Sequence, residues 1–344
     1  MRIVLDAMGT DECPVPDVAG AILAARESGD TIILIGDEAL IRREINKQRT
    51  ADVKLEIVHA TQVITMEDKP SVVGKAKPDS SMHVGLRLVQ DHSADAFVTA
   101  GNTGAAQAIA MLFTLHRIPG IRRPALSAIF PFNQRPITFL DIGANTDSKA
   151  EWLAQFALMG QVYAQNALGI NRPRVGLLSN GAEEGKGTQA TREASTILQQ
   201  LPLSLLNYIG NIEPRDIMHG TVDVVVSDGF TGNILIKTFE SSTRYLVNVL
   251  RDEMRRNVLS TLGALLARPA FNNTRRRLDT SEVGGAPLLG VNGVVIIAHG
   301  RSTPYAIKNA LLQAHKAVDG HILQSIEEGI SALDLDATHL QAEI

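Results

Sequence analysis

Glycine and small polar residues follow a strand-like run near the middle of the chain, and their types suit the binding of an anion. The run, Val222–Val226, is β-branched and apolar apart from Asp223, which predicts a buried strand. Turn residues follow it and lead into a predicted helix. Because free N–H groups at a helix start favour anions, the candidate binding residues are Asp228, Thr231, Gly232 and Asn233. The two glycines of this stretch would also suit a tight turn that binds nothing.

Five other predicted strands end in residues of the same kind. Since ligands bind beyond the carboxyl ends of parallel strands, we expect all six strand ends to line one crevice. His299 taken alone would more readily be a structural histidine that is held by hydrogen bonds. The five strands, each with the residues that follow it, are Arg2–Leu5 with Asp6 and Gly9, Ala96–Thr99 with Asn102, Thr103 and Gly104, Ile137–Leu140 with Asp141 and Asn145, Val175–Leu178 with Ser179–Gly181, and Val294–Ile297 with His299.

One loop, Gly181–Thr188, places a lysine among glycines just before a helix expected at Gly187–Gln200. It is not a P-loop, because its glycines are one residue too close together and Gly187 stands where a Mg²⁺-binding hydroxyl is needed. A glycine-rich loop with one lysine still suits a single phosphate group, which makes Lys186 a candidate ligand. A solvated loop of mixed charge would have the same composition.

The composition excludes several classes of function. The chain has 344 residues, of which 44% are hydrophobic and 20% charged, and its net charge of −4 argues against general nucleic-acid binding. Cys13 is the only cysteine, so neither an internal disulfide nor a cysteine-based zinc site is possible. No GxGxxG motif follows the early strands and no GxSxG motif occurs, and we expect neither a cofactor nor a metal. Without a signal segment or a membrane-length apolar run, we expect a soluble cytoplasmic protein.

Strands and helices alternate along most of the chain, which predicts a layered α/β fold without a clear domain boundary. Further strands are expected at Ile32–Ile35, Leu55–Val58, Leu126–Phe130 and Leu203–Tyr208, and Leu126–Phe130 should form a hairpin with Ile137–Leu140. Helices are expected at Asp17–Glu27, Glu38–Lys47, Ser80–Gln90, Thr103–Leu115, Asp147–Leu168 and Pro304–Val318, and a basic loop at Lys69–Pro78.

A long helical tract, Ile234–Leu266, departs from this alternation and continues past the sheet. Leucines and valines recur along it with helical spacing, and arginines lie among them. The pattern favours a projecting helical hairpin over residues 239–278 that contacts a membrane surface or an acidic partner, although a dimer-interface helix has the same pattern. The residues expected to make this contact are Leu259, Leu262, Leu266, Arg255, Arg256, Arg275 and Arg276.

Seven motifs occur in the order typical of one known family. Together they resemble the bacterial phosphate acyltransferases, which convert acyl-acyl-carrier protein and orthophosphate into acyl phosphate, the first step of a route to phospholipid. The resemblance runs from Met1 to about Ala317. The motifs are DAMG (Asp6–Gly9), AGNTGA (Ala100–Ala105), LDIGAN (Leu140–Asn145), EEGKG (Glu183–Gly187), GNIEPRD (Gly210–Asp216), DGFTGN (Asp228–Asn233), and GGAPLLGVNG (Gly284–Gly293) with His299-Gly300.

The resemblance implies an architecture and a set of partners. The fold would be a Rossmann-like three-layer α/β/α fold, similar to the phosphotransacetylases and the isocitrate and isopropylmalate dehydrogenases, with a single domain over residues 1–344. The protein would be a homodimer associated peripherally with the inner face of the cell membrane. A membrane glycerol-3-phosphate acyltransferase would use its product.

The resemblance also assigns roles to residues. The family's active-site lysine falls on Lys186 and its asparagine on Asn233. The sequence departs from the family at Thr10–Pro14, where GDHAP is the usual continuation, at Ser179 and Thr188, where asparagines are usual, and at Arg301, where a serine is usual. The residues that fall on the loops of the family's crevice are Asp6, Asn102, Thr103, Asp141, Asn145, Asp228 and Thr231.

The residues and the resemblance together predict a mechanism in which bound phosphate is the nucleophile. Lys186 and helix-start N–H groups would bind orthophosphate, and Asn233 would polarise the thioester carbonyl. A decarboxylating dehydrogenase shares the fold class, but the acidic cluster for its metal is absent from the sequence. A non-catalytic, membrane-docked scaffold would explain only the leucine and arginine tract. The acidic carrier protein has two candidate surfaces, Lys69–Lys77 and Arg275–Arg277.

Overall fold

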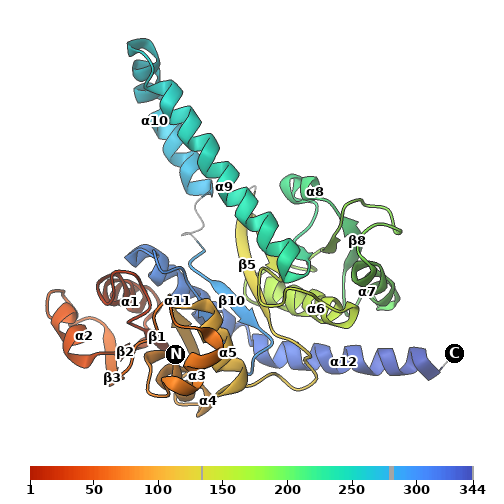
Figure 1. Cartoon of the computed structure of the whole chain (residues 1–344), viewed down its shortest axis with the longest axis horizontal. Helices are drawn as coiled ribbons and strands as arrows, with labels where there is room; N and C mark the ends of the chain where they lie inside the picture. The colour runs from red at the N-terminus through yellow and green to blue at the C-terminus, as the bar shows by residue number, and fades with distance from the viewer. Residues whose placement is uncertain (133–134, 279–282, 343–344) are drawn as a thin grey trace.

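A mixed β-sheet covered by helices on both faces forms the centre of the protein (Figure 1). The computed structural model describes residues 1–132, 135–278 and 283–342. Within these ranges the sheet has 11 strands in the order β3-β2-β1-β4-β11-β10-β5-β6-β9-β7-β8. The predicted three-layer α/β/α architecture is therefore confirmed.

The strands coincide with most of the apolar runs of the sequence. β5 and β6 form the predicted hairpin, with Ser127 opposite Leu140. The strands are β1 (Arg2–Asp6), β2 (Thr31–Gly36), β3 (Lys54–His59), β4 (Ala96–Thr99), β5 (Ala125–Phe132), β6 (Arg135–Leu140), β7 (Val175–Leu178), β8 (Tyr208–Ile212), β9 (Val224–Val226), β10 (Ala286–Leu289) and β11 (Val294–Ile297).

The helices also follow the predicted pattern, with three additions, α3, α8 and α12, that the sequence did not predict. They are α1 (Val15–Ser28), α2 (Glu38–Ile45), α3 (Pro70–Ala76), α4 (Ser81–Gln90), α5 (Thr103–Leu112), α6 (Ala150–Asn166), α7 (Gln189–Gln200), α8 (Pro214–His219), α9 (Gly229–Met254), α10 (Val258–Leu278), α11 (Pro304–Asp319) and α12 (Ile322–Ala342).

Two local predictions are wrong. The segment Lys69–Pro78 is not a loop but contains α3, in which Pro70 occupies the start of the helix, where proline is tolerated. Gly74 is needed there for packing rather than for a turn, because a Cβ atom at Gly74 would lie 2.4 Å from the Phe113 ring. The strand expected at Leu203–Tyr208 begins only at Tyr208, since the preceding residues turn back and Leu205 N–H donates to the Pro202 carbonyl at 2.9 Å.

The sheet changes direction at its centre, which corrects the expectation of one common strand edge. β10 is antiparallel to both β11 and β5, and β5 is antiparallel to β6. β6, β9, β7 and β8 are parallel to one another and therefore run opposite to β1–β4 and β11. The loops after β1, β4 and β11 lie at one edge of the sheet, and the loops after β6, β9 and β7 lie at the opposite edge. The six strand ends do not share an edge.

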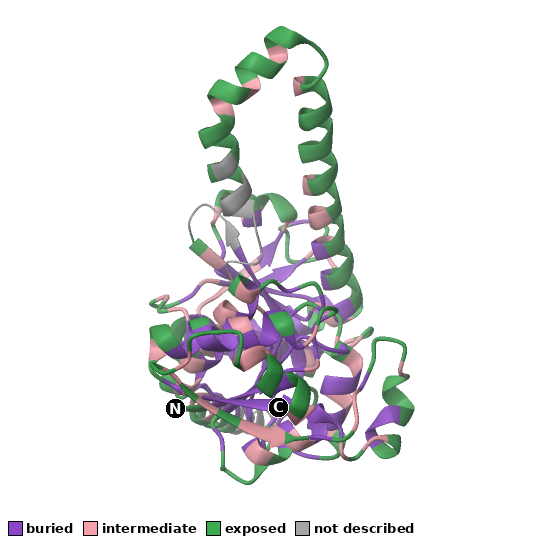
Figure 2. Ribbon diagram, turned by 90° about the vertical axis from the view of Figure 1, so that its left-hand side faces the viewer, coloured by how far each residue is buried: buried purple, intermediate pink, exposed green. Residues whose placement is uncertain are grey.

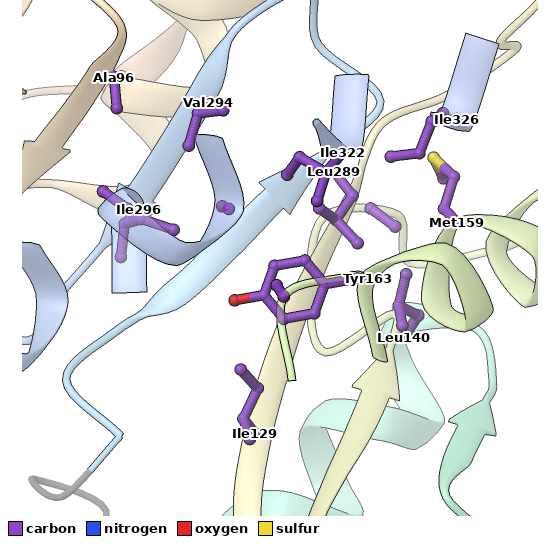
Figure 3. Close-up of a cluster of buried hydrophobic side chains, with 14 of the residues drawn as sticks. Ala96, Ile129, Leu140, Met159, Tyr163, Leu289, Val294, Ile296, Ile322 and Ile326 are labelled. Carbon is purple, nitrogen blue, oxygen red and sulfur yellow. The ribbon is translucent and has the colours of Figure 1, made fainter. Parts of the chain in front are cut away.

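One face of the sheet is covered without a break, and the other is divided. Figure 3 shows part of the continuous core, where Tyr163 of α6 and Ile326 of α12 pack among sheet residues. On the opposite face, α3–α5 pack over one half of the sheet and α9 over the other. Leu126 and Phe130 of β5 point to this divided face and belong to the two separate clusters. Ile142 touches both clusters and lies between them.

α9 and α10 form a hairpin that leaves the body of the molecule (Figure 1). Beyond the first two turns of α9, most of its described residues are exposed, as Figure 2 shows in green. Its large apolar side chains are among the most exposed of the chain, with Leu259 82% and Leu266 84% exposed. None of the described helices is long and apolar enough to cross a membrane. The hairpin therefore presents apolar surface that the described chain leaves uncovered.

Candidate active site

A buried carboxylate organises the loop that follows β6. Asp141 is fully buried, and its Oδ1 accepts hydrogen bonds from the backbone N–H groups of Leu126, Gly143 and Ala144 at 2.9 to 3.1 Å. Its Oδ2 accepts from the backbone N–H of Asn145 at 2.7 Å and from Asn145 Nδ2 at 2.9 Å. Burial raises the pKa of Asp141, and these hydrogen bonds oppose that rise. The carboxylate thus fixes the backbone of residues 141–145.

The first turn of α9 packs directly on this loop, which explains both glycines of the turn. A Cβ atom at Gly232 would lie 1.9 Å from the Asp141 carbonyl oxygen, and one at Gly229 would lie 2.5 Å from the Asn145 carbonyl oxygen. Gly229 N–H donates to that same Asn145 oxygen at 2.8 Å. Asp228 caps the helix by accepting from Thr231 N–H at 2.8 Å. The loops after β6 and β9 are therefore in contact.

The lysine loop leaves the neighbouring strand at the same edge. β7 pairs with β9, so the loop after Leu178 begins beside the loop after Val226. Gly187 has a φ of +97° and its N–H donates to Asn180 Oδ1 at 2.9 Å. Lys186 is exposed, and no described residue forms an ion pair or hydrogen bond with its ammonium group. Asn233 is also exposed, one residue after the close contact at Gly232.

At the opposite edge, most of the expected residues hold loops together. Asp6 is buried and accepts from Thr99 Oγ1 at 2.8 Å, and burial raises its pKa. Asn102 caps α5 by accepting from Ala105 N–H at 3.0 Å, while its Nδ2 donates to the carbonyl oxygens of residues 65, 66 and 68. Gly9 is required because a Cβ atom there would lie 2.8 Å from Ala100 N. Gly104 lies against Pro70, and Thr103 remains exposed.

Two helices bring the opposite edges toward each other. α5 starts at one edge and α9 at the other, and both cross the same face of the sheet. Gln107 of α5 donates from Nε2 to the Ala144 carbonyl at 3.4 Å. Partial burial is the main cause that lowers the pKa of His299, and the positive charges of Arg301 and Lys237 lower it further. Lys237 belongs to α9. The space between α5 and α9 is our candidate active site.

Sequence reasoning missed two residues that border this space, Gln107 and Lys237. Lys237 follows Asn233 by four residues, so the two side chains share one face of α9. Lys237 forms an ion pair with Glu240 at 3.6 Å, and both charges act on the His299 ring. The i,i+4 spacing after Asn233 is a signal that could have identified Lys237. Gln107 gave no such signal, because its partner is a backbone carbonyl from the other half of the sheet.

A second buried carboxylate lies near Asp6, beneath the loop after β1. Asp17 is fully buried and accepts from Thr10 Oγ1, while no described residue donates to its Oδ1. Burial raises the pKa of Asp17 to about 8. Across the described residues, no group of three or more histidine, cysteine, aspartate or glutamate side chains is arranged to hold a metal ion.

Comparison with known proteins identifies a family whose members resemble this chain. Residues 1–325 match the model of a family described as fatty acid synthesis protein. A phosphate acyltransferase from Dictyoglomus turgidum is 45% identical over 334 residues, which cover 97% of this chain and 98% of that protein. One from Trichlorobacter lovleyi is 45% identical over 331 residues, covering 96% and 95%. A phosphotransacetylase structure from Streptococcus pyogenes has a TM-score of 0.62 at 20% identity and covers 93% of this chain and 94% of its own, a likeness of fold.

Replacing Gly232 with alanine should destabilise the protein. The new Cβ atom would overlap a backbone oxygen of Asp141, which can move only if α9 separates from the β6 loop. Overpacking of this kind typically costs about 1–3 kcal/mol, and we expect Gly232→Ala at or above the upper end of that range. Urea unfolding measures the loss. Phe230→Ala, at an exposed position of the same turn, is the control and should change stability little. Equal stability of the two variants would contradict the close contact.

Asp17 should make stability depend on pH. Its pKa is about 8 in the folded protein against an ordinary value of 3.8. Between these two pH values, the folded state therefore binds one more proton than the unfolded state. Stability therefore falls as the pH rises from about 4 to about 8. Asp17→Asn keeps an acceptor for Thr10 and cannot ionise, so it should remove this fall and stabilise the protein at pH 8 by a few kcal/mol.

The measurement is urea unfolding of Asp17→Asn and wild type at pH 5 and pH 8. The exposed Asp91→Asn serves as control and should leave the pH dependence as in wild type. If Asp17→Asn gives the same difference between the two pH values as wild type, the buried carboxylate is not the source of the pH dependence.

Proposed function

This chain belongs to the phosphate acyltransferase family, and from this premise we propose that it transfers a fatty acyl group from acyl-acyl-carrier protein to orthophosphate. Membership makes it an acyltransferase of lipid synthesis. The finer proposal covers the donor, the nucleophile and the product, an acyl phosphate for phosphatidic acid synthesis. Residues 1–344 would act as one catalytic unit, with residues 239–278 as its projecting part. The observation that carries the proposal is the unpaired ammonium group of Lys186 on the loop after β7, the strand that pairs with the one leading into α9.

Phosphate would bind where the positive charge of Lys186 and the N-terminus of α9 come from adjacent strand ends. A lone, exposed ammonium group is free to pair with an anion, and the helix start adds the partial positive charge of its N–H groups. Phosphate already carries negative charge at neutral pH, so its oxygen can attack without a strong base. Asp228 and Thr231 hold the helix start in place by their mutual hydrogen bonds at 2.8 Å.

The reaction would proceed by direct attack on the thioester. A phosphate oxygen forms a bond to the carbonyl carbon, the carbonyl oxygen takes up negative charge, and the carbon–sulfur bond then breaks. The carrier leaves as a thiolate, which takes a proton from solvent. The side-chain amide of Asn233 would donate to the carbonyl oxygen as its charge develops. Lys237, one turn further along α9, and His299 across the space would bind or orient the phosphate.

The residues at the other edge of the sheet would act mainly by holding loops in place rather than by contacting substrate. The polar atoms of Asp6 and Asn102 are already bonded within the protein, as are those of Asp141 and Asn145. In the proposed function, these residues keep the strand-end loops in the geometry that the substrates need. Thr103 is exposed at the start of α5 and remains a candidate for direct contact.

The hairpin would bring the enzyme to the membrane surface. Its tip exposes Val258 and Leu259 beside Arg255 and Arg256, a combination of apolar and basic side chains that suits anionic lipid headgroups. Arg275 and Arg276 belong to α10, and their side chains lie outside the described part of the structure. We further propose a cytoplasmic homodimer, held peripherally at the membrane, that passes acyl phosphate to a membrane glycerol-3-phosphate acyltransferase.

Removing the lysine charge should nearly abolish turnover. We expect Lys186→Ala to lower phosphate-dependent release of carrier thiol from palmitoyl-acyl-carrier protein by about 100-fold or more, because one transition-state contact of this kind is typically worth a factor of that size. The melting temperature should not change, since Lys186 has no partner in the described chain. Lys54→Ala, an exposed lysine on β3, is the control. Release without phosphate in wild type, or near-normal activity of Lys186→Ala, would overturn the proposal.

The hairpin prediction concerns binding rather than chemistry. Replacing Leu259, Leu262 and Leu266 with serine should abolish co-sedimentation with vesicles that contain anionic phospholipid, since each buried leucine contributes about 1.5–3 kcal/mol. The rate of acyl transfer from dissolved acyl-acyl-carrier protein should stay near that of the wild type. Leu23→Ser with Leu40→Ser, two exposed leucines on the body of the molecule, is the control. Unchanged sedimentation of the triple variant would argue against membrane contact through this hairpin.

A further inference from the structure

A surface on α3 and the end of α5 combines exposed apolar side chains with exposed lysines. Val72 of α3 and Leu112 of α5 are 56% and 58% exposed, and Phe113, just after α5, is 38% exposed. Lys69 and Lys75 flank Val72 along the chain and are exposed. We call these five residues the α3–α5 surface. Exposed apolar groups bordered by charge are typical of protein-binding surfaces.

The two helices form one continuous platform rather than separate patches. Gly74 of α3 lies so close to Phe113 that an added Cβ atom would meet the ring at 2.4 Å. Pro70, the first residue of α3, lies against Gly104 in the first turn of α5. Asn102, the cap of α5, holds the segment that precedes α3 through the Asp68 carbonyl at 3.0 Å. The α3–α5 surface is therefore fixed to the helix that borders the candidate active site.

The charge of this surface differs from that of the chain as a whole. Residues 67 to 77 carry three lysines against Glu67 and Asp68, in a protein with a net charge of −4. Lys77 forms an ion pair with Asp68 at 2.5 Å, which leaves both Lys69 and Lys75 without an ion pair among the described residues. Two unpaired lysines around an apolar centre complement a partner that presents carboxylates around an apolar residue.

We infer that the α3–α5 surface is the docking site for the acidic carrier protein that delivers the acyl thioester. This inference rests on the proposed function for the identity of the donor. Docking at this place sets the carrier beside the first turn of α5, so that its thioester arm can enter between α5 and α9. Without this surface, the site would recognise only a thioester and a phosphate. The surface adds selectivity for the carrier protein. Of the two basic segments that the sequence offers for carrier binding, residues 69–77 and 275–277, this inference favours residues 69–77.

The test compares charge reversal at the surface with a matched reversal elsewhere. Lys69→Glu with Lys75→Glu should raise KM for palmitoyl-acyl-carrier protein at least tenfold and leave KM for phosphate and for palmitoyl-pantetheine, which has no protein part, unchanged. Val72→Ser with Leu112→Ser should raise the same KM. The control, Arg43→Glu with Lys54→Glu, makes the same net change of charge at exposed positions of α2 and β3 and should leave every KM unchanged.

A direct binding measurement separates this inference from the proposed function. The Kd of the carrier protein with a free thiol, measured by surface plasmon resonance, should rise at least tenfold in Lys69→Glu/Lys75→Glu and should rise with salt more steeply in wild type than in the variant. An unchanged Kd and KM in that variant would overturn the docking site, as would a response to Arg275→Glu with Arg276→Glu instead. A wild-type enzyme that binds the carrier yet shows no phosphate-dependent release would overturn the proposed function alone.

Discussion

The reversal of chain direction at the centre of the sheet determines where each polar loop of this protein lies. Because three successive strand pairs, β11–β10, β10–β5 and β5–β6, are antiparallel, the two halves of the sheet point their strand ends to opposite edges. A site formed at one edge would use only half of the loops. α5 and α9 start at opposite edges and cross the same face, so that Gln107 reaches Ala144 and the charge of Lys237 acts on His299. The divided face of the sheet is a consequence of the reversal.

The sequence predicted the strands and their end residues well, because both depend on local patterns. β-branched runs bounded by glycine and polar residues identified β1, β4, β7 and β11 to the residue or nearly so. The relative direction of strands is not local, since it depends on which strands pair. β10 was missed because it is short and contains Pro287, which argues against a strand in a sequence. The role of Asn102 was equally hidden, because its partners are backbone carbonyls about 35 residues earlier in the chain.

Three buried carboxylates, two of them at strand ends and Asp17 in α1, show how the same residue type serves different purposes. Asp141 receives five hydrogen bonds and orders a loop, so its charge is compensated by N–H groups. Asp6 receives bonds from Thr99 and Met8 N–H. Asp17 receives one, from Thr10, and retains an oxygen without a described donor. Burial raises the pKa of all three carboxyl groups, that of Asp17 to about 8.

α9 connects the candidate chemistry to the candidate membrane contact in one rigid element. It carries Asn233 in its second turn and ends at Met254, so about 30 Å of helix separate the two at 1.5 Å per residue. A hairpin standing upright on a membrane would hold the site at that distance, which is unfavourable for the proposed acyl phosphate product with its long apolar chain. Tyr245 and Leu246 are 73% and 59% exposed partway along α9, so apolar exposure is not confined to the tip. This distribution favours a hairpin that lies along the surface and brings the space between α5 and α9 close to the lipid.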